Sequence, residues 1–291
     1  MTTPDDEKSA GESASRFGSG PAYLNETFLK HPDARILRIL AEYLEPAKRF
    51  QELQIKDTIV FFGSARFISR EEAVAELAAI KATEDAESDA VQKAERRLFT
   101  SRYYEDTREL AHRLTLWSEA LPEKARRFVV CSGGGPGIME AANRGAFEAG
   151  GKSIGLNIEI PFEQKPNPHI TPDMNFDFHY FFMRKFWFAY LAKAMVAMPG
   201  GFGTLDELME ILTLVQTLKI KKAMPIVLFG TEFWRDVIDL NALVKHGTMS
   251  RQDLDLVFRT DSIDEAFDHV TRELTERYLY DEEATMGSGG M

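Results

Sequence analysis

Short apolar runs alternate with longer segments of helical periodicity along most of the chain. The runs that predict buried strands span residues 58–62, 127–131, 152–158, 177–181, 194–198, 224–229 and 255–259. This alternation predicts the α/β class, as a Rossmann-like parallel sheet with flanking helices in a single domain. We place the domain at residues 21–280, between a disordered tail at 1–20 and a frayed tail at 281–291.

The segment 192–219 combines a predicted strand, a glycine loop and a helix. Pro199 ends the strand, and the loop contains three residues at which the backbone can approach a ligand closely, namely Gly200, Gly201 and Gly203. Thr204 stands at the expected helix N-cap, and Glu207 follows at the spacing of a capping box. Such a loop directs free N–H groups and the positive end of a helix dipole at one point, which favours a phosphate. The alternative is a glycine-rich turn that merely packs well.

Two further turns follow predicted strands. Gly63 and Ser64 come directly after the first strand, where Rossmann-like sheets contact ligands, although an ordinary turn between strand and helix has the same sequence. The loop 133–137, which includes Gly134 and Gly135, follows the second strand. It is not a dinucleotide fingerprint, because Ile138 occupies the position of the last glycine. A cofactor-dependent dehydrogenase is therefore disfavoured.

Composition and charge narrow the functional classes. The net charge of −11 argues against a nucleic-acid groove, and no apolar run is long enough to span a membrane. Cys131 is the only cysteine, which fits a reducing cytoplasm, and the acidic N-terminus lacks the apolar core of a signal peptide. The 6 histidines form no spaced pair. We therefore predict a cytoplasmic protein with neither a metal site nor a cofactor.

Three motifs together resemble one known family. PGGFGTLDE, at residues 199–207, matches the pattern P-G-G-x-G-T-x-x-E, and Arg184-Lys185 matches the pair that accompanies it. The glycine block at residues 132–145 has a counterpart too. These motifs are similar to those of the LOG ("lonely guy") family of cytokinin riboside 5'-monophosphate phosphoribohydrolases, formerly described as possible lysine decarboxylases, and to related nucleotide 5'-monophosphate nucleosidases. The resemblance spans about residues 58–267.

The resemblance implies roles for particular residues. Glu207 and Arg184 would form the catalytic pair, with the Glu207 carboxylate stabilising an oxocarbenium-like ribose. Glu207 could instead serve only as a cap, and Arg184 and Lys185 could be a pair on a helix surface. The substrate-binding residues that the resemblance implies are Gly200, Gly201, Gly203, Thr204, Lys185, Gly63, Ser64, Gly134, Gly135 and Thr213.

The region at about 70–126 is charged, rich in alanine and longer than its counterpart in short family members. It predicts two helices, at about 70–97 and 99–120, which form a helical insertion or an extended hairpin. Its charged first half is typical of a solvated helix, and an oligomer contact is the alternative. Tyr103, Tyr104, Leu110 and Trp117 give the second helix a face to bury.

The leading hypothesis is a hydrolase that converts a purine nucleoside 5'-monophosphate, AMP or a cytokinin-type nucleotide, to free base and ribose 5-phosphate. One alternative is a non-catalytic Rossmann-like protein that binds a nucleotide or molybdenum cofactor, and another is a purely structural oligomer. The resemblance also implies a homodimer or larger homo-oligomer. Pyridoxal-dependent lysine decarboxylation has no support beyond the former description of the family.

Overall fold

The computed structural model describes residues 20–83, 88–122, 127–160, 165–220 and 224–279. The predicted tails at 1–20 and 281–291 lie outside these residues, apart from Gly20. The chain divides into two compact units, Met1–Glu45 and Pro46–Met291. The predicted domain boundaries stay predictions.

The first unit consists of short helical elements. The 3-10 helix η1 (Ala22–Leu24), α1 (Glu26–Lys30) and the 3-10 helix η2 (Pro32–Ala34) precede α2 (Arg35–Glu52), which continues into the second unit. Asn25 caps α1, because its side chain accepts a hydrogen bond of 3.0 Å from the Phe28 amide.

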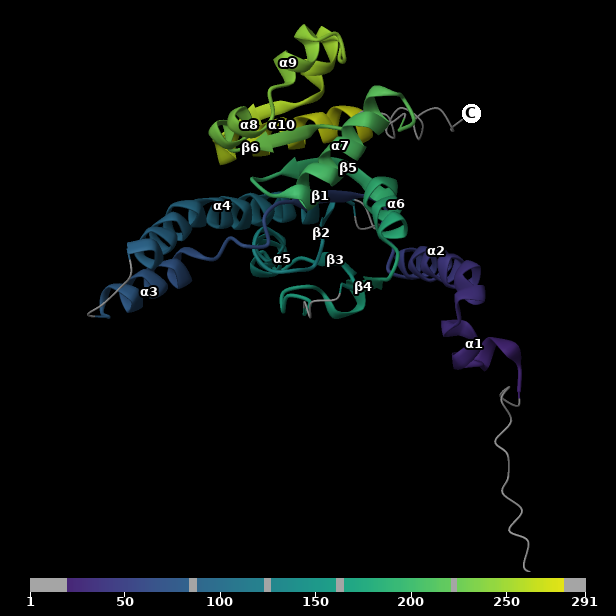
Figure 1. Cartoon of the computed structure of the whole chain (residues 1–291). Coiled ribbons are helices and arrows are strands. Elements are labelled where there is room, and N and C mark those ends of the chain that lie inside the picture. Colours follow the sequence, from purple (N-terminus) through teal and green to yellow (C-terminus); the bar gives the residue numbers. More distant parts are fainter. Residues whose placement is uncertain (1–19, 84–87, 123–126, 161–164, 221–223, 280–291) are drawn as a thin grey trace, which may run out of the picture. The chain divides into compact units, whose positions relative to one another are not determined.

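The second unit is built on one sheet, which Figure 1 shows between its helices. Its strands are β1 (Thr58–Phe62), β2 (Val129–Ser132), β3 (Ser153–Ile158), β4 (Asn175–Phe178), β5 (Ala192–Ala197), β6 (Ile226–Phe229) and β7 (Phe258–Thr260). All neighbouring strands are parallel, in the order β4-β3-β2-β1-β5-β6-β7. This arrangement confirms the predicted α/β class with a Rossmann-like parallel sheet.

Helices connect the strands. They are α3 (Arg70–Lys81), α4 (Ser88–Glu119), α5 (Ile138–Glu148), α6 (Phe181–Leu191), α7 (Phe202–Gln216), α8 (Thr231–Val237), α9 (Leu240–Lys245) and α10 (Ile263–Leu274), with the 3-10 helices η3 (Pro172–Met174) and η4 (Arg251–Leu256) and the π-helix η5 (Thr275–Leu279). Ser262 caps α10 by accepting a hydrogen bond from the Glu265 amide.

The strand order reverses beside β1. From β1 the chain adds strands on one side as far as β4, and it then returns to place β5 on the other side of β1. The register pairs Phe62, at the end of β1, with Ala197, at the end of β5. In open α/β sheets, ligands bind outside the carboxyl ends of the strands at this kind of reversal. The topology therefore directs attention to the turns after β1 and β5.

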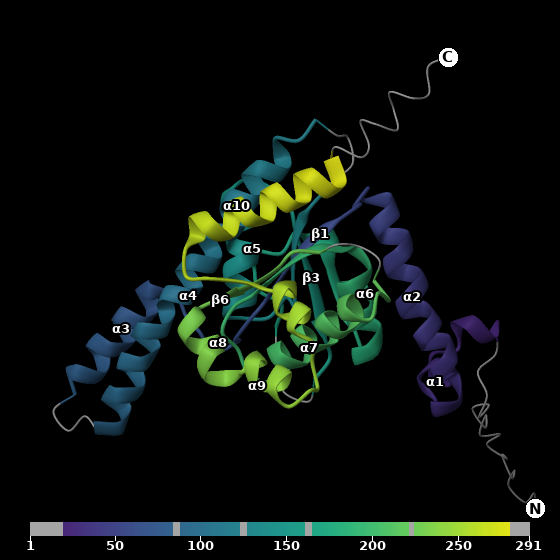
Figure 2. The ribbon, with the colours of Figure 1, turned by 90° about the horizontal axis from the view of Figure 1, so that it is seen from above.

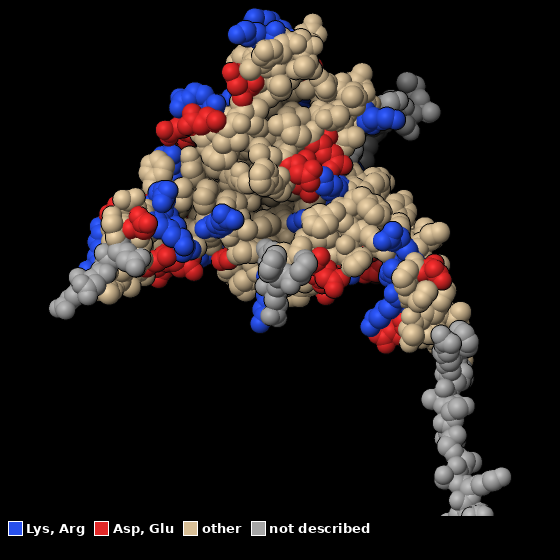
Figure 3. All heavy atoms as spheres, viewed as in Figure 1, with Lys and Arg blue, Asp and Glu red and all other residues tan. Residues whose placement is uncertain are grey.

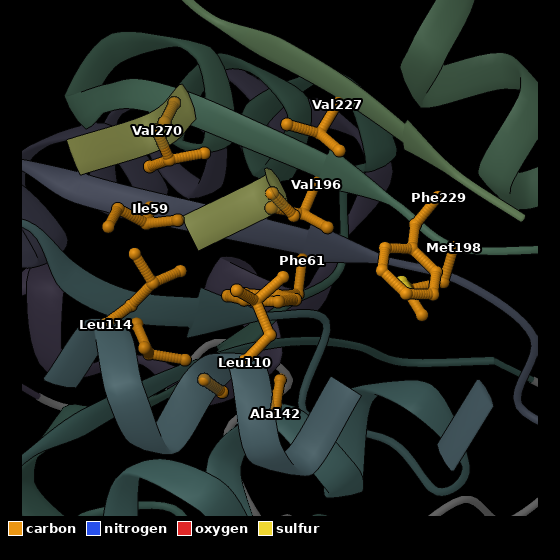
Figure 4. Packing of buried hydrophobic residues seen from close by; sticks show 14 of the residues in the cluster. Ile59, Phe61, Leu110, Leu114, Ala142, Val196, Met198, Val227, Phe229 and Val270 are labelled. Atoms are coloured by element: carbon orange, nitrogen blue, oxygen red, sulfur yellow. The ribbon is translucent and has the colours of Figure 1, made fainter. Parts of the chain in front are cut away.

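One face of the sheet packs against α4, α5 and α10. Ile59 and Phe61 lie two positions apart on β1, so both point to this face. There they meet Leu110 of α4 and Val270 of α10 (Figure 4). In Figure 2, α10 lies on the same side of the strands as α5, and α6 lies on the other side. On the opposite face, the rings of Phe62 and Phe188 of α6 meet edge to face at 4.8 Å. The odd-numbered and even-numbered residues of β1 are thus buried on opposite faces of the sheet, as is usual for a parallel sheet covered by helices on both faces.

The helix boundaries between residues 70 and 120 differ from the prediction. The sequence predicts a break near residue 98, whereas the structure has one helix over Ser88–Glu119 and a shorter one over Arg70–Lys81. The alanine-rich sequence favours helix throughout, so tertiary packing decides where the chain turns. Tyr103, Tyr104 and Leu110 are buried as predicted, and Trp117 stacks on Phe128 at 5.3 Å.

Smaller corrections concern the C-terminal half. The strand predicted at 177–181 lies at Asn175–Phe178, and the strand predicted at 255–259 lies at Phe258–Thr260 after a 3-10 helix. The sequence also suggests one helix from Phe233 to Val244, but α8 and α9 occupy this region. Asp239 caps α9 by accepting a hydrogen bond from the Ala242 amide.

A buried ion cluster lies at the amino ends of the central strands. Asp57 precedes β1 and is 2% exposed, and its carboxylate accepts a hydrogen bond of 3.0 Å from Arg127, which precedes β2. Lys193 of β5 approaches the other carboxylate oxygen at 3.3 Å. This cluster joins three strands at the end of the sheet opposite to the strand-reversal site.

Candidate functional site

The turns at the carboxyl ends of β1 and β5 border a cleft of about 710 Å³. The turn after β1 contributes Gly63, Ser64 and Arg66, and the loop and first turns of α7 contribute residues 200–207. Arg184 of α6 and Gly133, which follows β2, also line the cleft. The cleft is thus located where the strand order predicts a ligand site.

Close backbone contacts hold the turns against one another. The amide of Ser64 donates a hydrogen bond of 3.0 Å to the carbonyl of Pro199. A Cβ at Gly200 would lie 2.1 Å from Thr204 Oγ1 and 3.0 Å from the Ser64 nitrogen, and a Cβ at Gly63 would collide with Ile138 at 2.6 Å. Glycine at 63 and 200 therefore allows the close approach that the sequence suggests.

The predicted capping box is wrong. The N-cap of α7 is Gly201, so Thr204 is the third residue of the helix and is buried against Gly200. Among the described residues, no side chain caps this helix. The first N–H groups of a helix have no partner within it, and here Phe202, Gly203 and Thr204 line the cleft. The positive end of α7 is therefore available to an anion.

Glu207 lies one turn further along α7. Its side chain is buried, with 7% of its surface exposed, and it belongs to the lining of the cleft. Burial raises the pKa of Glu207 to about 7, although the positive charges of Arg184 and Lys185 act in the opposite direction. Its carboxylate forms no hydrogen bond or ion pair with the residues that the structure describes. A partly ionised carboxyl group thus opens onto the cleft.

Hydrogen bonding and packing hold Arg184 in place on the side of the cleft that α6 forms. Its Nε donates a hydrogen bond of 2.7 Å to the carbonyl of Leu156, and its guanidinium lies over the ring of Phe188 at 5.1 Å. A Cβ at Gly133 would lie 2.4 Å from Arg184 Nη2. Burial lowers the pKa of Arg184, and the nearby charge of Glu207 opposes this effect. The structure therefore brings the two predicted catalytic side chains to the same cleft.

Lys185 lies outside the lining of the cleft. Its ammonium group is 2.8 Å from both Asp206 Oδ2 and Glu210 Oε2, so it ties α6 to α7. Figure 3 shows acidic side chains gathered at this part of α7 with basic side chains against them. The side chain is 17% exposed. This position favours a role for Lys185 in holding α7 in place over a role in binding a ligand.

Three other predicted residues lie away from the cleft wall. Gly134 and Gly135 are buried, and their carbonyls accept hydrogen bonds of 3.1 Å from the Asn167 side chain. Thr213 is exposed on α7, and its hydroxyl donates a hydrogen bond to the carbonyl of Met209. Of the predicted set, Gly63, Ser64, Gly200, Gly201, Gly203, Thr204, Glu207 and Arg184 line the cleft.

A family model describes much of this site. Residues 139–270 match the family described as "Possible lysine decarboxylase", the former description of the LOG family. This part of the chain is similar to the LOG family. The LOG segment includes Arg184 and the loop before α7, and it begins within α5. The predicted family assignment is thereby confirmed.

Solved structures with a similar fold are distant from this chain. The protein TM1055, known from an X-ray structure, is 20% identical, with 74% of this chain and 99% of that protein covered and a TM-score of 0.45. A molybdenum cofactor carrier protein from Chlamydomonas reinhardtii is 20% identical, with coverage of 76% and 99% and a TM-score of 0.42. A molybdenum cofactor binding protein from Rippkaea orientalis is 16% identical, with coverage of 75% and 98% and a TM-score of 0.45. No curated protein sequence matches the chain.

The structure adds residues that sequence reasoning missed. Arg66 lines the cleft two positions after Ser64, and its place behind the first strand is the signal that could have identified it. Phe181, Phe202 and Phe233 form an apolar part of the wall, and Phe202 is 92% exposed. Aromatic residues are frequent in this chain, so no local pattern distinguishes these three.

A buried amide network supports the glycine block at residues 132–145. The Asn167 side chain donates to the carbonyls of Gly134 and Gly135 and to Asn143 Oδ1, at 3.1, 3.1 and 2.9 Å. Ser132 Oγ donates to the same Asn143 oxygen at 2.7 Å. The network fixes the loop that contacts Arg184 through Gly133.

Among the described residues, no group of three or more His, Cys, Asp or Glu side chains could hold a metal ion. Within the same residues, no helix is both long and apolar enough to cross a bilayer.

Proposed function

We propose that this chain is a phosphoribohydrolase that cleaves the N-glycosidic bond of a purine nucleoside 5'-monophosphate, AMP or a cytokinin-type nucleotide. The observation that carries the proposal is Glu207, a buried carboxyl group with a pKa of about 7 that opens onto the cleft without a hydrogen-bond partner among the described residues. The similarity of residues 139–270 to the LOG family supports it.

The start of α7 would bind the 5'-phosphate. Its first residues line the cleft, and no atom of the described residues lies within 4 Å of where a side chain would begin at Gly201 and Gly203. A phosphate can therefore approach the backbone directly, and the helix dipole favours its negative charge. Because Glu207 lies one turn further along the same helix, a ribose attached to this phosphate would lie close to the carboxylate.

The reaction breaks the bond between ribose C1' and the base nitrogen. The bonding electron pair leaves with the base, which takes up a proton, and positive charge develops on the ribose. The ionised Glu207 stabilises this charge, and it accepts a proton from the water whose oxygen bonds to C1'. A pKa near 7 suits this role, because the group can take up and release a proton at neutral pH.

Arg184 would orient the substrate. Its bond to the Leu156 carbonyl and its contact with Gly133 leave little freedom to its guanidinium. A fixed cation beside Glu207 keeps part of the carboxyl population ionised, since the positive charge opposes the effect of burial. Arg184 can thus serve both as a contact for the substrate and as the group that tunes Glu207.

The test is release of adenine from AMP, followed by chromatography, for the wild type and the variants Glu207→Gln and Glu109→Gln. Glu109 is exposed on α4 and serves as the matched control. We expect the Glu207 variant to lose about 10²- to 10³-fold in kcat and the control to retain wild-type activity. A panel with cytokinin monophosphates, GMP and CMP identifies the base. Folded wild-type protein that binds these nucleotides but cleaves none would refute the proposal and favour the non-catalytic binder.

A further inference from the structure

The charged side chains of α6 and α7 near the cleft supply too little positive charge to balance a phosphate. Lys185 is neutralised by Asp206 and Glu210, and Glu207 faces Arg184. A phosphate monoester carries close to two negative charges at neutral pH, whereas a helix N-terminus supplies about half a positive charge. The wall formed by α6 and α7 alone therefore lacks positive charge for such a ligand.

Arg66 is the remaining cation of the cleft. Of the described residues that line it, Arg66 and Arg184 are the basic ones. The Arg66 side chain is exposed and forms no hydrogen bond or ion pair with the part of the chain that the structure describes. Its guanidinium is therefore available to a ligand without breaking an existing interaction.

The backbone of Arg66 is fixed next to the start of α7. Its amide donates to Ser64 Oγ at 3.1 Å, the Ser64 amide donates to Pro199, and the Ser64 carbonyl accepts from Ile138 at 3.0 Å. A Cβ at Gly137 would lie 2.3 Å from that carbonyl, so the turn has no room to shift toward α5. These contacts fix the base of the Arg66 side chain beside the loop that precedes α7.

We propose that Arg66 binds the 5'-phosphate and makes the site select phosphorylated ribosides over unphosphorylated ones. The identity of the ligand rests on the proposed function. Besides the helix terminus, the guanidinium of Arg66, which is unpaired among the described residues, supports an anion at this place. The buried Glu207 lines the same cleft and has no partner among these residues, so it can contact the sugar of a ligand whose phosphate lies at the start of α7. Arginine suits phosphate because its planar fork can donate two parallel hydrogen bonds.

The test measures binding of ribose 5-phosphate and of ribose by calorimetry, which requires no catalysis. The variants are Arg66→Ala, Arg66→Lys and the control Arg70→Ala, an exposed arginine at the start of α3 that does not line the cleft. We expect Arg66→Ala to bind ribose 5-phosphate about 10- to 100-fold more weakly and Arg66→Lys to recover part of this loss. The control should bind as the wild type does. Thermal unfolding confirms that each variant is folded.

Kinetics separate the role of Arg66 from a general loss of structure. For cleavage of AMP, we expect Arg66→Ala to raise KM with little change in kcat, since the contact is made equally in the ground and transition states. Equal binding of ribose 5-phosphate by Arg66→Ala and the wild type would overturn the proposal, as would a wild type that does not bind ribose 5-phosphate. If Arg66 is needed for binding while no monophosphate is cleaved, the Arg66 proposal stands and the proposed reaction falls.

Discussion

Replacing Glu207 by glutamine should stabilise the protein in a manner that depends on pH. In the folded chain, burial raises the pKa of this carboxyl group from 4.5 to about 7. The folded state therefore binds the proton more tightly than the unfolded state does. Glutamine has nearly the same shape and no charge to desolvate, so the variant measures what the buried charge costs.

The sign and the size of this stability difference follow from the linkage between proton binding and folding. Between about pH 4.5 and 7 the folded state holds more protons than the unfolded state, so the contribution of Glu207 to stability decreases as the pH rises through this window. The two pKa values differ by about 2.5, which at about 1.4 kcal/mol for each unit corresponds to about 3 kcal/mol. We expect Glu207→Gln to be more stable than the wild type by up to about 3 kcal/mol at about pH 8. Near pH 4.5 the two should be almost equal.

The assay is urea unfolding of the wild type, Glu207→Gln and Glu109→Gln at several pH values across this window. Other groups also titrate there, but they are common to all three proteins, so the difference between variant and wild type isolates position 207. Glu109→Gln should differ little from the wild type at each pH, because Glu109 is exposed. The stabilised variant should also be the inactive one, as expected when a strained group serves catalysis.

Two outcomes would refute this reasoning. A stabilisation that is the same at every pH would arise from packing and not from the buried charge. A variant less stable than the wild type near pH 8 would mean that the ionised carboxylate is well solvated or paired, contrary to its burial in the structure. Either result would also remove the physical basis for a proton-accepting role at neutral pH.

Two further substitutions test the framework of the site. Arg127→Ala should lower the free energy of unfolding by about 3 kcal/mol, because among the described residues it leaves Lys193 as the remaining partner of the buried Asp57 carboxylate. A change below about 1 kcal/mol in chemical denaturation would contradict this role. Asn167→Ala should cost about 2 kcal/mol in the same measurement, because the carbonyl of Gly135 and the Asn143 oxygen lose a buried donor. Unchanged stability of the Asn167 variant would show that the network does not hold the loop.

The helix boundaries show where local patterns are insufficient. Thr204 and Glu207 match a capping box in sequence, yet α7 begins two residues before Thr204. The loop 200–201 is drawn against the turn at Ser64, so contacts with a distant part of the chain set the first helical residue. The start of α4 has a similar origin, because a sequence that favours helix on both sides of the break contains no clear signal for its position, whereas the end of α4 at Glu119 agrees with the predicted end at about residue 120.

The candidate site shows the same contrast between what a local motif predicts and what tertiary contacts decide. Arg184 and Glu207 are recognisable from their motifs, and the structure places both on one cleft. The motif does not distinguish residues that face the cleft from residues that support it. Lys185 adjoins Arg184 in sequence but points to Asp206 and Glu210. Gly134 is part of a glycine-rich loop but is directed toward Asn167.

The sequence by itself determined the alternation of strands and helices, the glycine turns and the similarity of residues 139–270 to a known family, because periodicity, glycine and motif spacing are properties of short segments. Only the tertiary structure decided the strand order that brings the turn at Ser64 beside the loop before α7. It also decided the burial that raises the pKa of Glu207, and the position of Arg66 on the same cleft. These features depend on which distant residues exclude water from a given atom, and no short segment contains that information.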